Sequence, residues 1–232
     1  MLFRSFLKNQ RQRLVRRALE SEISQTFRRL ESRRVLSVTA VFGGGVLDIT
    51  IANDGSGTDA GLLTTGANFF VDADGDQTFD VGETTDLMSN LKQINVNGDA
   101  GVGSFLWRGD FSSAGGVGGM NGLAVQNVNT AVIDTTAILK LNADIAAASS
   151  VSFGTSLTVN GDLTTQASGA GGLISNAANA TLVVDGNASF TAQTITLGSA
   201  ANDNMQFGSL TFNSTGSVSV VEDGSSLLVG AS

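Results

Sequence analysis

The sequence of 232 residues contains no cysteine, no histidine, no tyrosine and no proline. Without cysteine there can be no disulfide, no thiolate nucleophile and no cysteine-ligated zinc. Without histidine the chain lacks the most frequent general base and the commonest ligand of transition metals. These absences weigh against most enzyme classes, so the composition predicts a protein that is not an enzyme.

Basic residues are scarce in most of the chain. Residues 1–34 hold ten of the thirteen lysines and arginines and three acidic residues, a net charge of 10 − 3 = +7. The remainder has only Lys92, Arg108 and Lys140 against eighteen acidic residues, a net charge of 3 − 18 = −15. Such asymmetry is typical of a targeting segment that precedes a folded body. Because an acidic body repels polyanions, we expect no nucleic-acid partner.

The basic segment has the pattern of an amphipathic helix over residues 1–35. Its apolar residues recur at intervals of three and four: Phe3, Leu7, Leu14, Ala18, Leu19, Ile23, Phe27 and Leu30. No apolar run reaches the 7–15 or so residues of a secretory signal or the roughly 20 of a membrane span. The segment therefore predicts a targeting extension, or alternatively an anchor lying on an anionic membrane, and no transmembrane span.

A short motif ends this segment. "LESRRVL" at residues 30–36 is similar to the Leu-Glu-Pro-Arg-x-Leu-Leu motif of the LEPR-XLL family, with serine in place of proline and valine in place of one leucine. The four matching positions are Leu30, Glu31, Arg33 and Leu36. That motif lies near the N-terminus of large planctomycete proteins thought to be exported or displayed at the cell surface. The resemblance implies an extracellular or cell-surface location.

From residue 36 the apolar pattern changes to a period of two, which is typical of strands. In "VLDITIA" the residues Leu47, Ile49 and Ile51 alternate with polar ones, and Gly43, Gly44 and Gly45 suit a hairpin turn from the preceding "SVTAVF". Further strands are expected at "INV", "SLTVNGD", "TLVVDG", "QTITLG", "SLTFN" and "SVSVVED". The fold class is therefore predicted to be mainly β.

A loose repeat indicates how these strands are arranged. "FGTSLTVNGD" at residues 153–162 echoes "FGSLTFNSTG" at 207–216, and aligning Asn160, Asp185 and Asn213 gives steps of 25 and 28 residues. Steps of this size suit one coil of a parallel β-helix or solenoid, and a β-sandwich with evenly spaced turns is the alternative. We therefore divide the chain into a targeting helix (1–35), a β region with an acidic loop (36–120) and solenoid-like repeats (121–232).

The stretch "FFVDADGDQTFDVGE", residues 69–83, carries the strongest chemical signal. Calcium prefers six to eight oxygen ligands from carboxylates and carbonyls of a tightly folded loop. In EF-hand spacing, positions 1, 3, 5, 7, 9 and 12 are Asp72, Asp74, Asp76, Thr78 through its carbonyl, Asp80 and Glu83. Gln77 stands at position 6, where glycine is usual. The stretch resembles the calcium loops in β domains of bacterial surface proteins, whereas a solvated acidic turn is the alternative.

Two smaller signals lie close together in "LWRGDF". Arg108-Gly109-Asp110 is the tripeptide of integrin ligands, although a Gly-Asp turn after a strand explains it equally. Trp107, the only tryptophan, is expected in the core or as an anchor at a strand edge, rather than as a platform for a sugar.

Together these observations predict a non-enzymatic, cell-surface or secreted structural or adhesin-like β protein with a calcium-stiffened loop. Its expected partners are extracellular matrix, cell-envelope or polysaccharide surfaces, and self-association through the solenoid ends is a further expectation. One alternative is a carbohydrate-active β-helix enzyme or a carbohydrate-binding module. A lyase of that kind needs a cationic base, and only Lys92, Arg108 and Lys140 could supply one in the body. The other alternative is a membrane-associated module led by the N-terminal helix.

Overall fold

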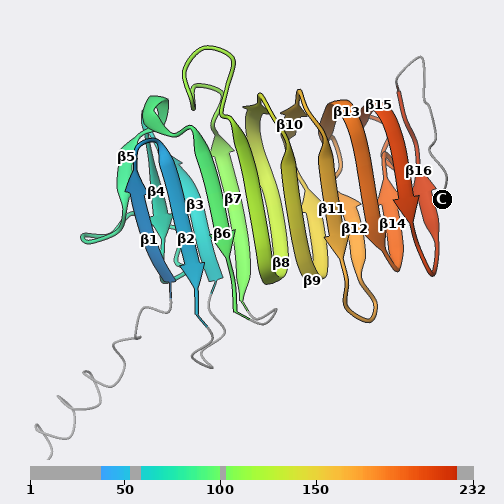
Figure 1. Cartoon of the computed structure of the whole chain (residues 1–232), viewed down its shortest axis with the longest axis horizontal. Coiled ribbons are helices and arrows are strands. Elements are labelled where there is room, and N and C mark those ends of the chain that lie inside the picture. Colours follow the sequence, from blue (N-terminus) through green and yellow to red (C-terminus); the bar gives the residue numbers. More distant parts are fainter. Residues whose placement is uncertain (1–37, 53–58, 100–102, 224–232) are drawn as a thin grey trace, which may run out of the picture. The chain divides into compact units, whose positions relative to one another are not determined.

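The computed structural model describes residues 38–52, 59–99 and 103–223, which are mainly β (Figure 1). The strands are β1 (Val38–Gly43), β2 (Val46–Ile51), β3 (Asp59–Thr65), β4 (Asn68–Asp72), β5 (Thr85–Leu87), β6 (Gln93–Asn97), β7 (Ser104–Asp110), β8 (Gly122–Leu139), β9 (Ala143–Phe153), β10 (Ser156–Val159), β11 (Leu163–Ala167), β12 (Leu173–Asn176), β13 (Thr181–Ala192), β14 (Thr194–Leu197), β15 (Asn204–Asn213) and β16 (Val218–Val220). A short 3-10 helix, η1 (Met88–Asn90), follows β5. The helix predicted over residues 1–35 and the motif at 30–36 lie outside the described residues.

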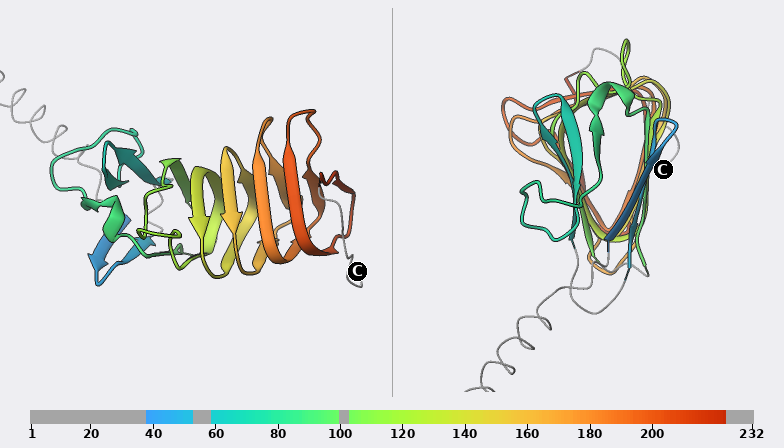
Figure 2. Two further views of the ribbon diagram at one scale, coloured as in Figure 1. Left: turned by 90° about the horizontal axis from the view of Figure 1, so that it is seen from above. Right: turned by 90° about the vertical axis from the view of Figure 1, so that its left-hand side faces the viewer.

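The strands wind into a β-solenoid of about five turns. Three parallel ladders run along it, as the bands of strands in Figures 1 and 2 show. The first passes through β2, β6, β8, β9, β11, β13 and β15. The second passes through β3, β7, β8, β9, β12, β14 and β16, and the third through β8, β10, β13 and β15. The prediction of a mainly β, solenoid-like body is confirmed, and the β-sandwich is not what forms.

The chain from Leu36 to Ser232 forms one compact unit. The first two ladders continue from β6 and β7 into β8, so they pass the boundary placed at residues 120–121 without a break. Among the residues that the structure describes, no helix has the length and hydrophobicity needed to cross a membrane.

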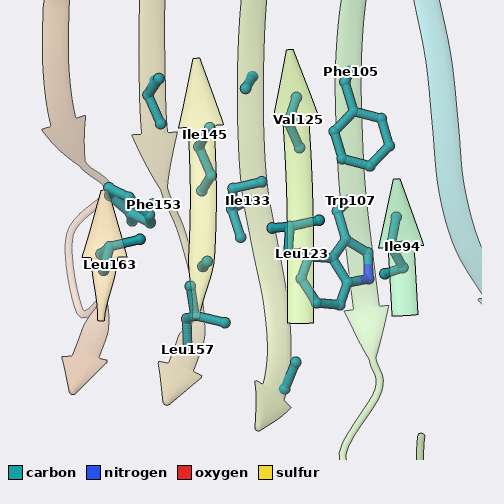
Figure 3. Packing of buried hydrophobic residues seen from close by; sticks show 14 of the residues in the cluster. Ile94, Phe105, Trp107, Leu123, Val125, Ile133, Ile145, Phe153, Leu157 and Leu163 are labelled. Atoms are coloured by element: carbon teal, nitrogen blue, oxygen red, sulfur yellow. The ribbon is translucent and has the colours of Figure 1, made fainter. Parts of the chain in front are cut away.

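The core is built from inward side chains that stack from coil to coil (Figure 3). In the first coils of the first ladder, Leu47 stacks on Ile94 and Ile94 on Leu123. From β8 to β15 the stacked positions are Leu123, Ala143, Leu163, Ala188 and Leu210, each exposed by 3% or less. Large and small side chains therefore alternate down this row, which fills the narrow interior at the density of a protein core.

The corner before the first ladder is fastened by short polar side chains. Asn142 Oδ1 accepts a hydrogen bond from the backbone N–H of Asp162 (3.0 Å), and Asp162 Oδ1 accepts one from the N–H of Asn187 (2.8 Å). Glycine precedes two of these residues because an added Cβ would lie 2.3 Å from Asn142 Oδ1 at Gly161 and 2.3 Å from Asp162 Oδ1 at Gly186. The Asn-Gly-Asp and Asp-Gly-Asn sequences are thus successive rungs of one corner.

The predicted repeat was half right. Asn160 and Asp185 follow paired ends of β10 and β13, so the step of 25 residues is a true coil. The step of 28 to Asn213 is wrong, since Val184 pairs with Phe207 and Asp185 therefore corresponds to Gly208, at the register shift before the β13–β15 pairing resumes at Asn187 and Ser209. The similarity between residues 153–162 and 207–216 compares strands of two different ladders, since β10 belongs to the third ladder and residues 209–212 of β15 to the first. The physical reason is that turns draw on a small set of residues, chiefly glycine, asparagine, aspartate and serine, so similar turns recur within a coil as well as between coils.

The two ends of the solenoid differ. At the N-terminal end the predicted hairpin is present, with Gly44 and Gly45 at φ 61° and 90°, and β1 pairs antiparallel with β2. The strands β4 and β5 extend the second ladder from β3 in the same antiparallel manner. At the other end Val218 stacks on Ile195 and is 36% exposed, whereas Ile195 is fully buried. No further strand pairs with β16 within the described part of the chain beyond β14.

Candidate metal centre

The acidic loop, residues 73–84, joins the antiparallel strands β4 and β5. Its first predicted ligand, Asp72, is the last residue of β4 and is 1% exposed, because β4 is buried from Phe69 onward. The base of the loop is closed by a hydrogen bond from Val71 N–H to the Thr84 carbonyl (2.9 Å). Thr84 Oγ1 also donates to the carbonyl of Ala40 in β1 (3.0 Å). The loop therefore starts and ends on fixed backbone.

Asp72 organises the backbone of the loop around its carboxylate. Its Oδ1 accepts hydrogen bonds from the N–H groups of Asp74 (3.2 Å) and Gly75 (2.7 Å), and its Oδ2 accepts one from Gln77 N–H (2.8 Å). Asp74 repeats the pattern, since its Oδ1 accepts from Asp76 N–H (3.2 Å). Such side-chain to backbone bonds favour a tight loop over a strand or a helix.

Asp76 is held in turn by Thr78. Its Oδ1 accepts hydrogen bonds from the backbone N–H (2.7 Å) and from the hydroxyl (2.6 Å) of Thr78. These bonds, the hydroxyl foremost, lower the pKa of Asp76. The carboxylate therefore stays ionised at any pH near neutrality.

Carboxylate oxygens of Asp72, Asp74 and Asp76 lie within 4.8 Å of one another and could hold a metal ion. Three anions at this separation repel one another, and a divalent cation between them would offset that repulsion. Oxygen-only ligands of this kind suit hard cations rather than transition metals.

The remaining predicted ligands lie on the same loop but outside this group. Glu83 is turned to the backbone, where its Oε1 accepts from Ala73 N–H (3.0 Å) and its Oε2 from Asp80 N–H (3.0 Å). Burial raises the pKa of Glu83, and the negative charges of Asp72 and Asp74 add to that rise. Glu83 thus closes the loop, while Asp80 and Thr78 stand at exposed positions along it.

Gln77 adopts the left-handed conformation that position 6 demands, with φ 62°. For a residue other than glycine this conformation costs about 1–2 kcal/mol. Gln77 is therefore held there by contacts, and its side chain makes one: Gln77 Oε1 accepts a hydrogen bond from Arg108 Nη1 (2.8 Å). The flanks are the strands β4 and β5 and not the helices of an EF-hand.

A cleft of about 410 Å³ lies between β1 and the acidic loop. Its lining combines apolar side chains with three carboxylates: Val38, Ala40, Val71 and Val81 with Asp74, Asp80 and Glu83. The cleft gives solvent and small cations access to the loop from this side.

The basic residues of the body do not converge on one groove. Arg108 on β7 pairs with Asp134 of β8, with Nε 3.1 Å from Oδ2. Lys92 precedes β6 and lies beside the Gly45 turn, and Lys140 follows β8 and lies beside Gly118. Only Arg108 of these three contacts the acidic loop through a hydrogen bond that the structure records.

The sequence "LWRGDF" folds as a strand end and a turn. Trp107 is fully buried, and its ring meets that of Phe111 edge to face with centroids 5.4 Å apart. Gly109 has φ 119°, and Asp110 Oδ1 accepts a hydrogen bond from Ser112 N–H (2.9 Å). Local contacts therefore account for this tripeptide, and Trp107 lies in the core as predicted.

Sequence reasoning missed the contact between Arg108 and the acidic loop. The two residues are 31 positions apart, and their meeting depends on how the coils stack. The only sequence signal was the isolation of Arg108, a lone arginine in an acidic body.

No protein-family model matches the sequence, and neither the curated proteins nor the solved structures contain a significant match. The fold and the acidic loop are therefore the basis for any functional proposal.

Proposed function

We propose that this chain is a non-enzymatic, secreted or cell-surface structural protein whose solenoid presents long sheet faces for adhesion or matrix assembly. The proposal rests on one observation: the ladders of parallel strands continue through the whole described body, and this body carries an organised acidic loop. Expected partners are extracellular matrix, cell-envelope or polysaccharide surfaces, which a long regular face can contact at many points.

Calcium is the cation that the loop fits best. Asp72, Asp74 and Asp76 already converge, and Thr78, Asp80 and Glu83 lie in register to complete six or more oxygen ligands after a modest rearrangement. Because Glu83 must leave two backbone N–H groups to bind, we expect weak affinity, roughly 0.1–1 mM, which is typical of extracellular modules. Calcium would then stiffen the loop rather than take part in chemistry.

Three alternatives compete with this proposal. A carbohydrate-active enzyme would need a cationic base, yet Arg108 is engaged by Asp134 and Gln77. A carbohydrate-binding module or a membrane-associated module would show itself by binding polysaccharide or anionic liposomes, respectively. Turnover of an acidic polysaccharide by the full chain would replace the structural proposal with the enzyme.

The deciding experiment is a thermal melt of the full chain in millimolar calcium and in EDTA, followed by the fluorescence of buried Trp107. A ligand that binds only the native state raises the melting temperature. We expect a rise in calcium that is lost in the isosteric double variant Asp74→Asn/Asp76→Asn. Asp144→Asn, an exposed acidic residue of β9, is the matched control and should keep the rise. Equal melts in calcium and EDTA would refute the calcium part of the proposal.

A further inference from the structure

A single guanidinium joins the acidic loop to the solenoid. Arg108 Nη1 donates to Gln77 Oε1 in the loop (2.8 Å), and Arg108 Nε donates to Asp134 Oδ2 on β8 (3.1 Å). The planar, rigid fork of arginine allows both bonds at once, which the single ammonium of lysine cannot reproduce with the same reach.

Asp134 is itself fixed by the next coil. Thr155 Oγ1 donates to Asp134 Oδ1 (2.7 Å), and this bond, together with Arg108, lowers the pKa of Asp134 despite its partial burial. Gly154 leaves the room that Asp134 occupies, since a Cβ there would lie 2.3 Å from Asp134 Oδ1. A continuous set of contacts therefore runs from Gln77 through Arg108 and Asp134 to Thr155.

Gln77 connects this set of contacts to the backbone of the acidic loop. Its backbone N–H bonds to Asp72 Oδ2 (2.8 Å), so the position of Gln77 is tied to that of the buried carboxylate. A glycine at this place would adopt φ 62° without strain but would offer no side chain to Arg108. Glutamine at this place therefore adopts a less favourable backbone conformation than glycine would, but its side chain can bond to Arg108.

We propose that Arg108 is a positioning residue of the acidic loop: it holds Gln77 beside β7 and so pre-orders the carboxylates of Asp72, Asp74 and Asp76. Pre-ordering strengthens binding because less conformational freedom is lost when a ligand arrives. The proposal that Arg108 orders the loop does not depend on calcium binding, whereas its consequence for calcium affinity rests on the proposed function. Arg108 also carries a positive charge, which by Coulomb's law opposes a nearby cation, so the two effects have opposite signs.

The experiment uses the full chain and two variants. Arg108→Lys keeps the charge and loses the fork, and Gln77→Ala keeps the Arg108–Asp134 pair and loses only the anchor. Lys140→Arg exchanges the same two residue types outside this set of contacts and serves as the control. Hydrogen exchange of the backbone amides of residues 73–84 in EDTA reports loop order, and calorimetric titration with calcium alone reports affinity.

We expect both variants to speed amide exchange in the loop by about three- to tenfold and to weaken calcium binding by a similar factor, consistent with one hydrogen bond to a charged group at a half-exposed site. The melting temperature in EDTA should change little, because the core is untouched. Unchanged loop exchange in both variants, or tighter calcium binding by Gln77→Ala, would overturn the proposal.

Two further outcomes are distinguishable. If the wild-type chain binds no calcium but both variants speed loop exchange, Arg108 positions the loop and the calcium function fails. If Arg108→Lys fails to fold, Thr155→Val decides the question, since it removes only the brace on Asp134. Thr155→Val should also speed amide exchange in the loop. Unchanged exchange in this variant would contradict the proposal that the contacts from Thr155 through Asp134 and Arg108 position Gln77.

Discussion

Phe42 of β1 and Phe69 of β4 meet edge to face, with ring centroids 5.2 Å apart and ring planes at 74°. The two strands belong to different ladders, since β1 extends the first and β4 the second. Their rings therefore meet across the N-terminal end of the core. The antiparallel strands β1, β4 and β5 and this aromatic pair therefore lie together at that end of the core.

Phe42→Ala should loosen that end without unfolding the body. Such an aromatic pair contributes about 0.5–1.5 kcal/mol beyond the apolar area that it buries. We expect faster amide exchange in β1 and β2, while the exchange of β9 and β11 stays as in the wild type. Val41→Ala, at a side chain of the same strand that is 67% exposed, is the control and should change neither.

Gly186→Ala should destabilise the polar corner. The new Cβ would lie 2.3 Å from Asp162 Oδ1 and 2.6 Å from the Gly161 carbonyl, so the corner must shift. Overpacking of this kind costs about 1–3 kcal/mol. The measurement is urea unfolding followed by Trp107 fluorescence. Gly43→Ala, where nothing lies within 4 Å of an added Cβ, should leave the midpoint unchanged, and equal midpoints for both variants would contradict the steric account.

The alternation of large and small core residues predicts a compensating pair. Ala143→Leu adds volume against Leu163 in the next coil and should cost about 1–3 kcal/mol, and Leu163→Ala should cost about 2–5 kcal/mol. Because the two side chains stack in register, the double variant should be more stable than the sum of the single effects implies. A double-mutant cycle by urea unfolding measures the coupling, and strict additivity would argue against a tightly packed row.

Asp203 gives the protein an acid-sensitive corner. It is 7% exposed and accepts hydrogen bonds from Asn176 Nδ2 (2.8 Å), Ala200 N–H (2.8 Å) and Ala180 N–H (3.2 Å). Burial by itself raises the pKa of Asp203, but these bonds together bring it below the usual 3.8. A folded-state pKa below the unfolded one adds stability above the unfolded value, and this stability is lost as the pH falls through the folded value.

The prediction concerns the pH dependence of unfolding. Asp203→Asn should cost about 1–3 kcal/mol at pH 7, since bonds to a charged acceptor are lost or weakened. The difference between the variant and the wild type should shrink below pH 4, where Asp203 of the unfolded chain is protonated. Urea unfolding at several pH values tests this, and a difference that is independent of pH would exclude the ionised carboxylate as its source.

Local features were predictable from the sequence, and distant contacts were not. Alternation of Leu47, Ile49 and Ile51 with polar residues marked β2, and the spacing of the aspartates marked the loop, because both depend on neighbours in the chain. Which strands pair depends on coil length, and coil length is hidden where corners of different ladders use similar turn residues, as Asn160-Gly161 and the Asn213–Gly216 turn do. The contact between Arg108 and Gln77 could not be predicted either, because it forms only when the coils stack in their correct register.

The row from Leu123 to Leu210 also bears on how such a protein can change in size. Because large and small residues alternate from coil to coil, removing or inserting one coil would set leucine on leucine or alanine on alanine. Two coils together restore the alternation and leave the contacts at either side as they were. For this row, a change of one coil therefore calls for a compensating substitution at the new junction, whereas a change of two coils does not.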